Sequence, residues 1–129
     1  MQRFKDGWEC WNDHELDLMA DMYAPDAELD LSPVFDDMPI FKGKESMRRQ
    51  WEELWQTWEG LRMDPIEVFD VGDERFLVDV RLWGRGKRSG AEVDQRFAFL
   101  YTVRESDDLV VGLKVFPTLA AALEAAGAS

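Results

Sequence analysis

An aspartate and an arginine lie two residues apart in the stretch VDVRLWGRGKRSG, residues 78–90. Side chains alternate across a strand, so a strand here places Asp79, Arg81 and Trp83 on one face. Asp79 is the candidate general base of the chain, and Arg81 is its candidate partner. Three interpretations stay open for this pair: it acts in catalysis, it orients a polar group of a ligand, or it only satisfies its own charges on the sheet.

Other catalytic or metal-binding groups are sparse in the sequence. His14 is the single histidine, and it falls in the first turn of a predicted helix, where we expect a solvated side chain. Asp36 and Asp37 have no histidine partner nearby, so a solvated loop is favoured over a metal site. No G-x-S-x-G motif is present, and the GRGKRSG segment lacks the following helix that a phosphate-binding loop needs. We therefore expect neither a metal ion nor a cofactor.

The composition is typical of a single acidic domain, which we place at residues 1–129. Of the 129 residues, 46% are hydrophobic, and the formal net charge is −12. A protein that binds nucleic acid needs a basic face, so we expect no nucleic acid partner. The longest apolar runs fall far short of the roughly 18 residues of a membrane span. The N-terminus, MQRFKDGWEC, has no hydrophobic signal core, so we expect a cytoplasmic protein with no membrane partner.

Hydrophobic periodicity predicts the elements that must position these groups. The clearest helix covers residues 44–59, where one apolar stripe is formed by Met47, Trp51, Leu54, Trp55 and Trp58. Two shorter helices are predicted before Pro25, and another at 118–126 with Thr118 as its N-cap. Strands are predicted at 27–32, 62–71, 74–84, 92–104 and 109–116.

The order of these elements indicates an α+β fold, in which helices gather against an antiparallel sheet. Both faces of that sheet are apolar: Phe97, Phe99 and Tyr101 share one face of a strand, and Ala98 and Leu100 share the other. An antiparallel sheet covered on one side only should carry polar residues on its other side. The predicted helices are too few to cover both faces, so we predict a homodimer through the outer face of the sheet.

Four segments resemble SnoaL-like proteins of the nuclear transport factor two-like superfamily. They are WECWNDHELDLMADMYAPDAELDLSP, FKGKESMRRQW, VRLWGRGKRSGAEVDQRF and LKVFPTLAAALEAAG, in the order and spacing of that family. The resemblance implies a cone-shaped, cystatin-like α+β barrel, in which a curved antiparallel sheet wraps around N-terminal and central helices and leaves a pocket at the wide end. The family includes polyketide cyclases, ketosteroid isomerases and limonene-epoxide hydrolases.

The resemblance also implies which side chains line the cone. The expected lining consists of Trp8, Leu29, Leu31, Met47, Trp51, Trp55, Leu77, Asp79, Arg81, Gln95, Phe97, Phe99, Tyr101 and Val115. An aromatic lining with few polar groups is typical of a small-molecule site, so we expect a hydrophobic, cyclic or aromatic ligand. The alternative is that these side chains fill the cone and the protein is a non-catalytic binding or interaction module.

The catalytic residues of the family carry over only in part. At the positions where limonene-epoxide hydrolases use catalytic residues, Asp79 matches, whereas Leu77 and Val115 replace an arginine and an aspartate. Leu29 and Leu31 stand where that family has tyrosine and asparagine. Phe99 occupies the position of the acid in ketosteroid isomerases and SnoaL-type cyclases. An isomerase, cyclase or hydrolase activity therefore depends on Asp79 as the base, with Arg81 in place of the missing arginine.

Overall fold

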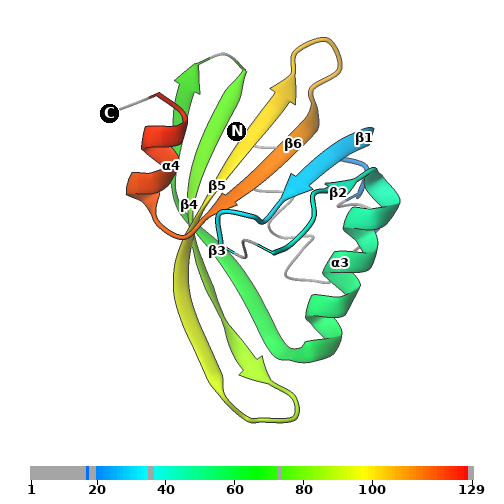
Figure 1. Ribbon diagram of the computed structural model, residues 1–129, viewed down its shortest axis with the longest axis vertical. Helices are drawn as coiled ribbons and strands as arrows, with labels where there is room; N and C mark the ends of the chain where they lie inside the picture. The colour runs from blue at the N-terminus through cyan, green and yellow to red at the C-terminus, as the bar shows by residue number, and fades with distance from the viewer. Residues whose placement is uncertain (1–16, 18–19, 35–36, 73, 128–129) are drawn as a thin grey trace.

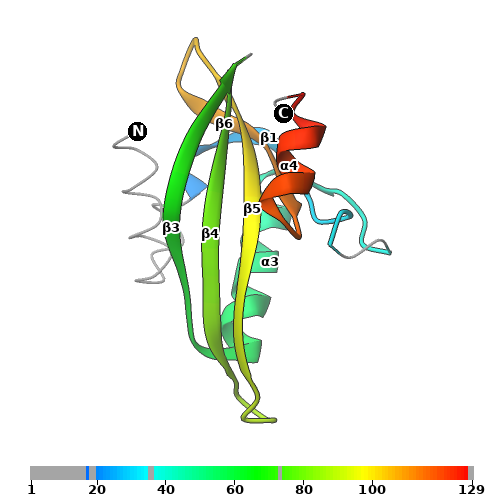
Figure 2. The same cartoon turned by 90° about the vertical axis from the view of Figure 1, so that its left-hand side faces the viewer.

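Six strands and two helices make up the part of the chain that the computed structural model describes, residues 17, 20–34, 37–72 and 74–127. The elements are β1 (Tyr23–Asp30), β2 (Phe41–Lys42), α3 (Lys44–Thr57), β3 (Trp58–Gly72), β4 (Arg75–Gly86), β5 (Glu92–Arg104), β6 (Leu109–Phe116) and α4 (Leu119–Ala125). The strands form one sheet in the order β2-β1-β6-β5-β4-β3 (Figure 1). Figure 2 shows that β3, β4 and β5 are long and curve together.

The sheet is mixed, because β1 and β6 run parallel, with Leu29 opposite Leu113. The other pairs, β1 with β2 and the consecutive hairpins β3 to β6, are antiparallel. The expected sheet was wholly antiparallel, and that detail is wrong. Turn residues in the sequence identify the antiparallel hairpins, whereas the pairing of β1 with β6 joins segments about eighty residues apart and has no local signal.

Helix α3 lies against one face of the sheet, which we call the inner face. Met47 and Trp51, from the apolar stripe of the sequence, are buried there. The helix ends at Thr57, two residues earlier than predicted, and Trp58 turns directly into β3. Gly60, directly after the predicted helix, lies within β3 with a φ of 61°.

Helix α4 covers part of the opposite, outer face, so the two described helices lie on opposite sides of the sheet (Figure 1). Thr118 caps the helix as predicted, since its hydroxyl accepts a hydrogen bond of 3.1 Å from the Ala121 backbone N–H. A guanidinium nitrogen of Arg75 donates a 2.9 Å hydrogen bond to the carbonyl of Ala126 at the other end. Beneath the helix, a second apolar cluster consists of Leu77, Ala98, Leu100, Phe116, Ala122 and Ala126.

This second cluster bears on the sequence argument for a dimer. The dimer was predicted because the apolar residues of the outer face need cover. In the structure α4 covers them, because Leu77 and Leu100 pack against Ala122. The apolar part of the outer face therefore needs no second copy, although its exposed part remains available to one.

The hairpin between β4 and β5 extends beyond the rest of the sheet and approaches the end of α3. Within the predicted loop, the Gly86 N–H donates to the Ala91 carbonyl, and the Gly90 N–H donates to the Gly86 carbonyl, both at 2.9 Å. The Lys87 N–H also donates to the Thr57 carbonyl at 3.1 Å, which joins the hairpin to the last turn of α3. These bonds fix one end of the inner face, where β3 leaves α3.

Candidate functional site

The predicted catalytic pair lies on the outer face of the sheet, away from α3. Val78 and Val80 point to the inner face and pack in the cluster that contains Met47 and Trp51. Leu77 points the opposite way and packs under α4. Asp79 and Arg81 share the face of Leu77 because side chains alternate along β4. The prediction that Leu77, Asp79 and Arg81 line the cone is therefore wrong.

The physical reason for this error is the apolar character of both faces of β4. A shift of one residue in the assignment moves every side chain of a strand to the other face. Alternation usually settles the question, but Leu77, Val78 and Val80 are all fully buried, on two different faces. The cover that α4 gives to Leu77 is a tertiary contact, which the pattern of β4 alone does not reveal.

Asp79 and Arg81 do not pair with each other. Asp79, only 5% exposed, forms an ion pair with Arg96 of β5. Arg81 binds Asp94 through two hydrogen bonds of 2.9 and 2.8 Å. The hydrogen bonds from Arg81 lower the pKa of Asp94, and the same contact raises the pKa of Arg81. Both predicted residues are therefore engaged in cross-strand pairs.

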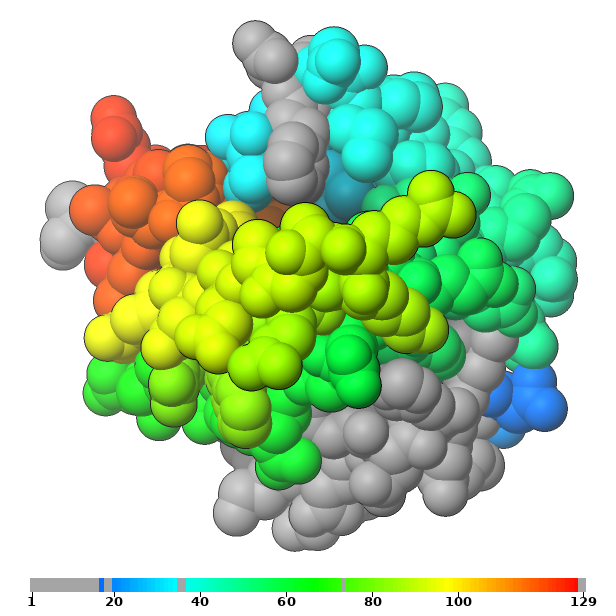
Figure 3. Space-filling model, turned by 90° about the horizontal axis from the view of Figure 1, so that it is seen from below, coloured from blue at the N-terminus to red at the C-terminus, as the bar shows by residue number. Residues whose placement is uncertain are grey.

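The inner face carries a cavity of about 220 Å³ between α3 and strands β3 to β6. The described residues that line it are Leu31, Val34, Gln50, Leu54, Trp58, Leu61, Met63, Leu82, Val93, Gln95, Phe97, Phe99 and Val115. Seen from the hairpin end, Figure 3 shows a recess between the segment after β1, in cyan, and β4 and β5, in yellow-green. All these lining residues are apolar except Gln50 and Gln95.

Several residues predicted from the sequence line this cavity. They are Leu31, Gln95, Phe97, Phe99 and Val115. Leu29, Met47, Trp51 and Tyr101 are also on the inner face, where they are buried in the apolar core, and Trp55 is partly buried against it. Trp8 lies outside the described residues.

Other lining residues were not predicted as site residues. Leu54 and Trp58 belong to the apolar stripe of residues 44–59, so their direction could have been inferred from that stripe. Leu82 and Val93 could have been predicted once the inner faces of β4 and β5 were assigned correctly, since Leu82 is opposite Gln95 in the ladder. No signal in the sequence indicates that Met63 or Val34 lines a cavity. Met63 lies beside an irregular part of β3. Val34 lies in a loop.

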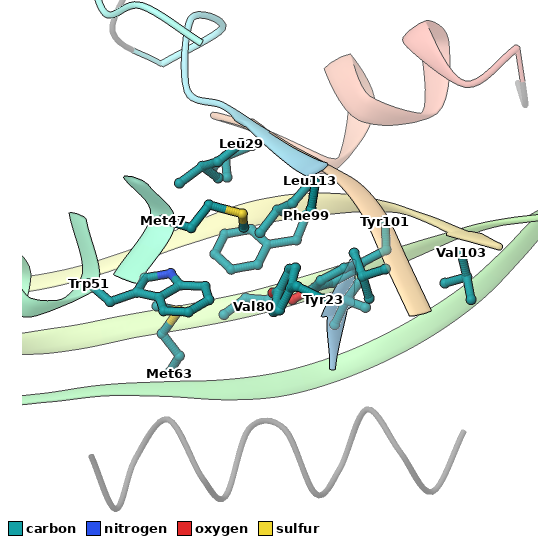
Figure 4. Close-up of a cluster of buried hydrophobic side chains, with 14 of the residues drawn as sticks. Tyr23, Leu29, Met47, Trp51, Met63, Val80, Phe99, Tyr101, Val103 and Leu113 are labelled. Atoms are coloured by element: carbon teal, nitrogen blue, oxygen red, sulfur yellow. The ribbon is translucent and has the colours of Figure 1, made fainter. Parts of the chain in front are cut away.

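Beside the cavity, the inner face carries a cluster of buried side chains that pack against one another, as Figure 4 shows. The rings of Tyr23 and Trp51 contact each other at a tilt of 56°, with centroids 5.3 Å apart, and Phe99 meets Tyr101 edge to face at 6.3 Å. Tyr23 lies in the region where a short helix was predicted before Pro25, and it is instead the first residue of β1. The packed cluster and the cavity adjoin on the same face, because Leu61, Met63 and Phe99 belong to both.

Tyr23 and Tyr101, both in this buried cluster, are hydrogen-bonded to each other. Burial raises the pKa of Tyr23, and the bond from Tyr101 lowers it by a smaller amount. Burial also raises the pKa of Tyr101 well above its ordinary value, and the neighbouring Tyr23 raises it further. Both phenols therefore stay neutral at physiological pH.

The described residues hold no cluster of three or more histidine, cysteine or acidic side chains placed to bind a metal ion. Nor does any helix in the described ranges have the length and apolar character of a membrane span.

Comparison with known proteins identifies the fold. The family model for the SnoaL-like domain matches residues 4–112. Among curated proteins, none matches this sequence. The structure is similar to that of the epoxide hydrolase/cyclase-like enzyme SalBIII, which acts in pyran ring formation in the polyether salinomycin. The TM-score is 0.77 at 12% identity, over 92% of this chain and 90% of the other.

Two further structures were solved with small molecules. RV0760c from Mycobacterium tuberculosis, in complex with estradiol-17beta-hemisuccinate, has a TM-score of 0.73 at 18% identity, over 92% of each chain. TerC, co-crystallized with polyporic acid, has a TM-score of 0.77 at 14% identity, over 98% of this chain and 97% of the other. At sequence identities of 12–18%, the similarity to these three structures establishes the fold and not the activity. The predicted α+β cone, with its curved sheet, is confirmed.

Proposed function

Because the chain belongs to the SnoaL-like domain family, we propose that it binds a small apolar molecule with a ring, in the cavity on the inner face of the sheet. The observation that carries this proposal is the cavity itself, about 220 Å³ and lined by Trp58, Phe97, Phe99 and aliphatic side chains. A mainly apolar cavity with a few polar groups is the usual form of a small-molecule site. The complex of RV0760c with estradiol-17beta-hemisuccinate and the co-crystallization of TerC with polyporic acid agree with this use of the fold.

The size of the cavity limits the ligand. An apolar cavity of about 150 Å³, made by engineering in another protein, accommodates benzene. A cavity of about 220 Å³ therefore suits one substituted ring or a small fused pair rather than a steroid-sized molecule. A larger ligand would need part of its body to project from the mouth.

Binding is favoured over catalysis by the residues at the cavity. A general base must come within hydrogen-bond reach of the proton that it removes. Asp79 lies on the other face of the sheet, paired with Arg96, so it does not meet a ligand on the inner face. The described lining residues include no carboxylate, histidine or lysine that could take its place. The hypothesis of an isomerase, cyclase or hydrolase with Asp79 as base is accordingly the weaker one.

The exposed part of the outer face supports a second proposal, that two copies associate there. This part, which we call the charged patch, consists of side chains that lie side by side on β3, β4 and β5: Arg62, Asp64, Arg81, Trp83 and Asp94. The Trp83 indole N–H donates to Asp64 at 3.1 Å, and the Arg81 guanidinium lies 5.6 Å from the Trp83 ring centre. Tryptophan and arginine are enriched at the centres of interfaces. Positive and negative groups are balanced on this patch, although the chain as a whole carries −12.

The proposed binding function is tested by filling the cavity. Val93→Phe enlarges a lining side chain, and Ile66→Phe makes a similar enlargement at an exposed position of β3 away from the cavity. Calorimetric titration with small aromatic compounds is expected to show saturable binding to the wild type and to Ile66→Phe, and at least about tenfold weaker binding to Val93→Phe. Equal binding by all three proteins, or binding by none, would contradict the proposal.

A further inference from the structure

We infer that the cavity takes an uncharged ring compound with one hydrogen-bonding end, and that Gln50 and Gln95 recognise that end. This inference rests on the proposed binding function. It adds to that function the chemical class of the ligand and the two side chains that select it.

The two glutamines are the polar side chains among the described lining residues. Gln50 projects from α3 and is half-buried, whereas Gln95 projects from β5 and is exposed. Within the described part of the chain, neither amide has a side-chain hydrogen-bond partner. Each amide offers a carbonyl acceptor and two N–H donors with which it can bond a ligand.

The exposure of Gln95 indicates how a ligand is oriented. An exposed lining side chain lies where the cavity meets solvent, whereas Phe99 and Val115 are buried and lie deeper. A ring therefore enters first and packs against the apolar wall. Its polar end stays near the mouth, where it meets Gln95 of β5 and Gln50 of the neighbouring helix α3.

The absence of charge in the described lining favours an uncharged ligand. Burying an ion without a partner of opposite charge is costly, and an amide does not supply a full opposite charge. No aspartate, glutamate, lysine, arginine or histidine is among the described lining residues. The net charge of −12 further disfavours an anion, because the field of the whole protein repels it. A ring that carries a ketone, amide, lactone or alcohol is uncharged and has one hydrogen-bonding end.

The experiment compares four probes of similar size at neutral pH. Benzamide, benzoate and benzamidinium share one planar shape and differ in charge, and cumene provides an apolar reference. Their dissociation constants are measured by NMR titration of the full chain, as wild type, Gln50→Leu, Gln95→Leu and Gln56→Leu. Gln56 is the matched control, because it lies on the same helix as Gln50, is exposed, and does not line the cavity.

Wild type is expected to bind benzamide at least about tenfold more tightly than either ion. Gln50→Leu and Gln95→Leu should each weaken benzamide by about three- to tenfold relative to cumene, the effect of losing one neutral hydrogen bond. Gln56→Leu should leave that ratio unchanged. Loss of fold is detected for each variant by its amide spectrum, and cumene binding shows that the cavity is intact.

The outcomes separate this inference from the proposed function. If no probe binds, the proposed function fails and the inference fails with it. If cumene and benzamide bind but either ion binds as tightly as benzamide, the cavity is a binding site and its preference for uncharged ligands is wrong. If both glutamine variants retain the wild-type ratio of the benzamide and cumene dissociation constants, the assignment of Gln50 and Gln95 is overturned. The proposed function and the preference for uncharged ligands then stand.

Discussion

Arg81 of β4 lies directly opposite Arg96 of β5, so two cations face each other across the ladder on the outer face. Like charges in this position destabilise a sheet unless other groups neutralise them. Here each arginine binds a carboxylate of the other strand, Arg81 with Asp94 and Arg96 with Asp79. This crossed arrangement explains how an aspartate is buried at position 79 without belonging to a cavity.

The crossed pairs predict a difference between two similar variants. Arg96→Leu leaves Asp79 buried with no partner of opposite charge, and should lower the free energy of unfolding by about 1–3 kcal/mol. The value stays below that of a fully buried pair because the Arg96 side chain is 61% exposed. Arg81→Leu leaves the exposed Asp94 in water, and its effect should be much smaller. Urea unfolding of both variants measures the difference, and equal losses would show that burial of Asp79 is not the determining factor.

Stability should fall at alkaline pH because of Tyr23 and Tyr101. Both have folded pKa values above the ordinary value of 10.0, so above about pH 10 the unfolded chain loses phenolic protons that the folded chain keeps. Each tyrosine then lowers the free energy of unfolding by about 1.4 kcal/mol per pH unit, and below pH 10 neither contributes a slope.

This alkaline slope has a direct control. The chain holds two tyrosines, so tyrosinate absorbance reports on this pair alone. Tyr101→Phe should halve the slope that the pair contributes, although it also lowers stability at neutral pH by removing a buried hydrogen bond. Tyrosinate absorbance that develops near pH 10 while circular dichroism still reports a folded protein would refute the burial argument.

Docking of α4 should depend on Leu77. This side chain is fully buried beneath the helix, and Leu77→Ala should cost about 2–5 kcal/mol through lost contacts and the space left behind. Leu109→Ala, at a half-buried position at the start of β6, removes the same atoms and should cost less. Thermal unfolding compares the two variants. A larger loss from Leu109→Ala would show that the cluster under α4 adds little stability.

The proposed association through the charged patch predicts a particle of twice the chain mass of 15.0 kDa. Trp83→Glu places a negative charge at the centre of the patch and should give a monomer, whereas Arg49→Glu, at an exposed position of α3, should not. Light scattering at micromolar concentration distinguishes the two states. A wild type that is already monomeric contradicts this proposal and leaves the cavity proposal untouched.

The sequence predicted the elements better than the site. Strands 92–104 and 109–116 agree with β5 and β6 because turn residues and alternating apolar residues mark them locally. The face of β4 was misassigned, since Leu77, Val78 and Val80 are equally apolar and differ only in which helix covers them. Phe97 and Phe99 mark the inner face of β5, so the sequence places Gln95 on the face where it lines the cavity, while its role in ligand binding stays a prediction. Gln50 borders the apolar stripe of the predicted helix, three residues after Met47 and four before Leu54, but a single polar residue at that border was not predicted as a site residue.

The central claim is that the ligand site lies on the inner face of the sheet rather than beside Asp79. The most direct measurement is an NMR titration of methyl-labelled leucine with benzamide, because leucines occupy both faces. The account predicts that the methyl signals of Leu31, Leu54, Leu61 and Leu82 shift with a common dissociation constant. The signals of Leu77, Leu100 and Leu119, which lie on the outer face, should not move. Saturable shifts confined to the outer-face leucines, or no saturable shift in either group, would contradict the account.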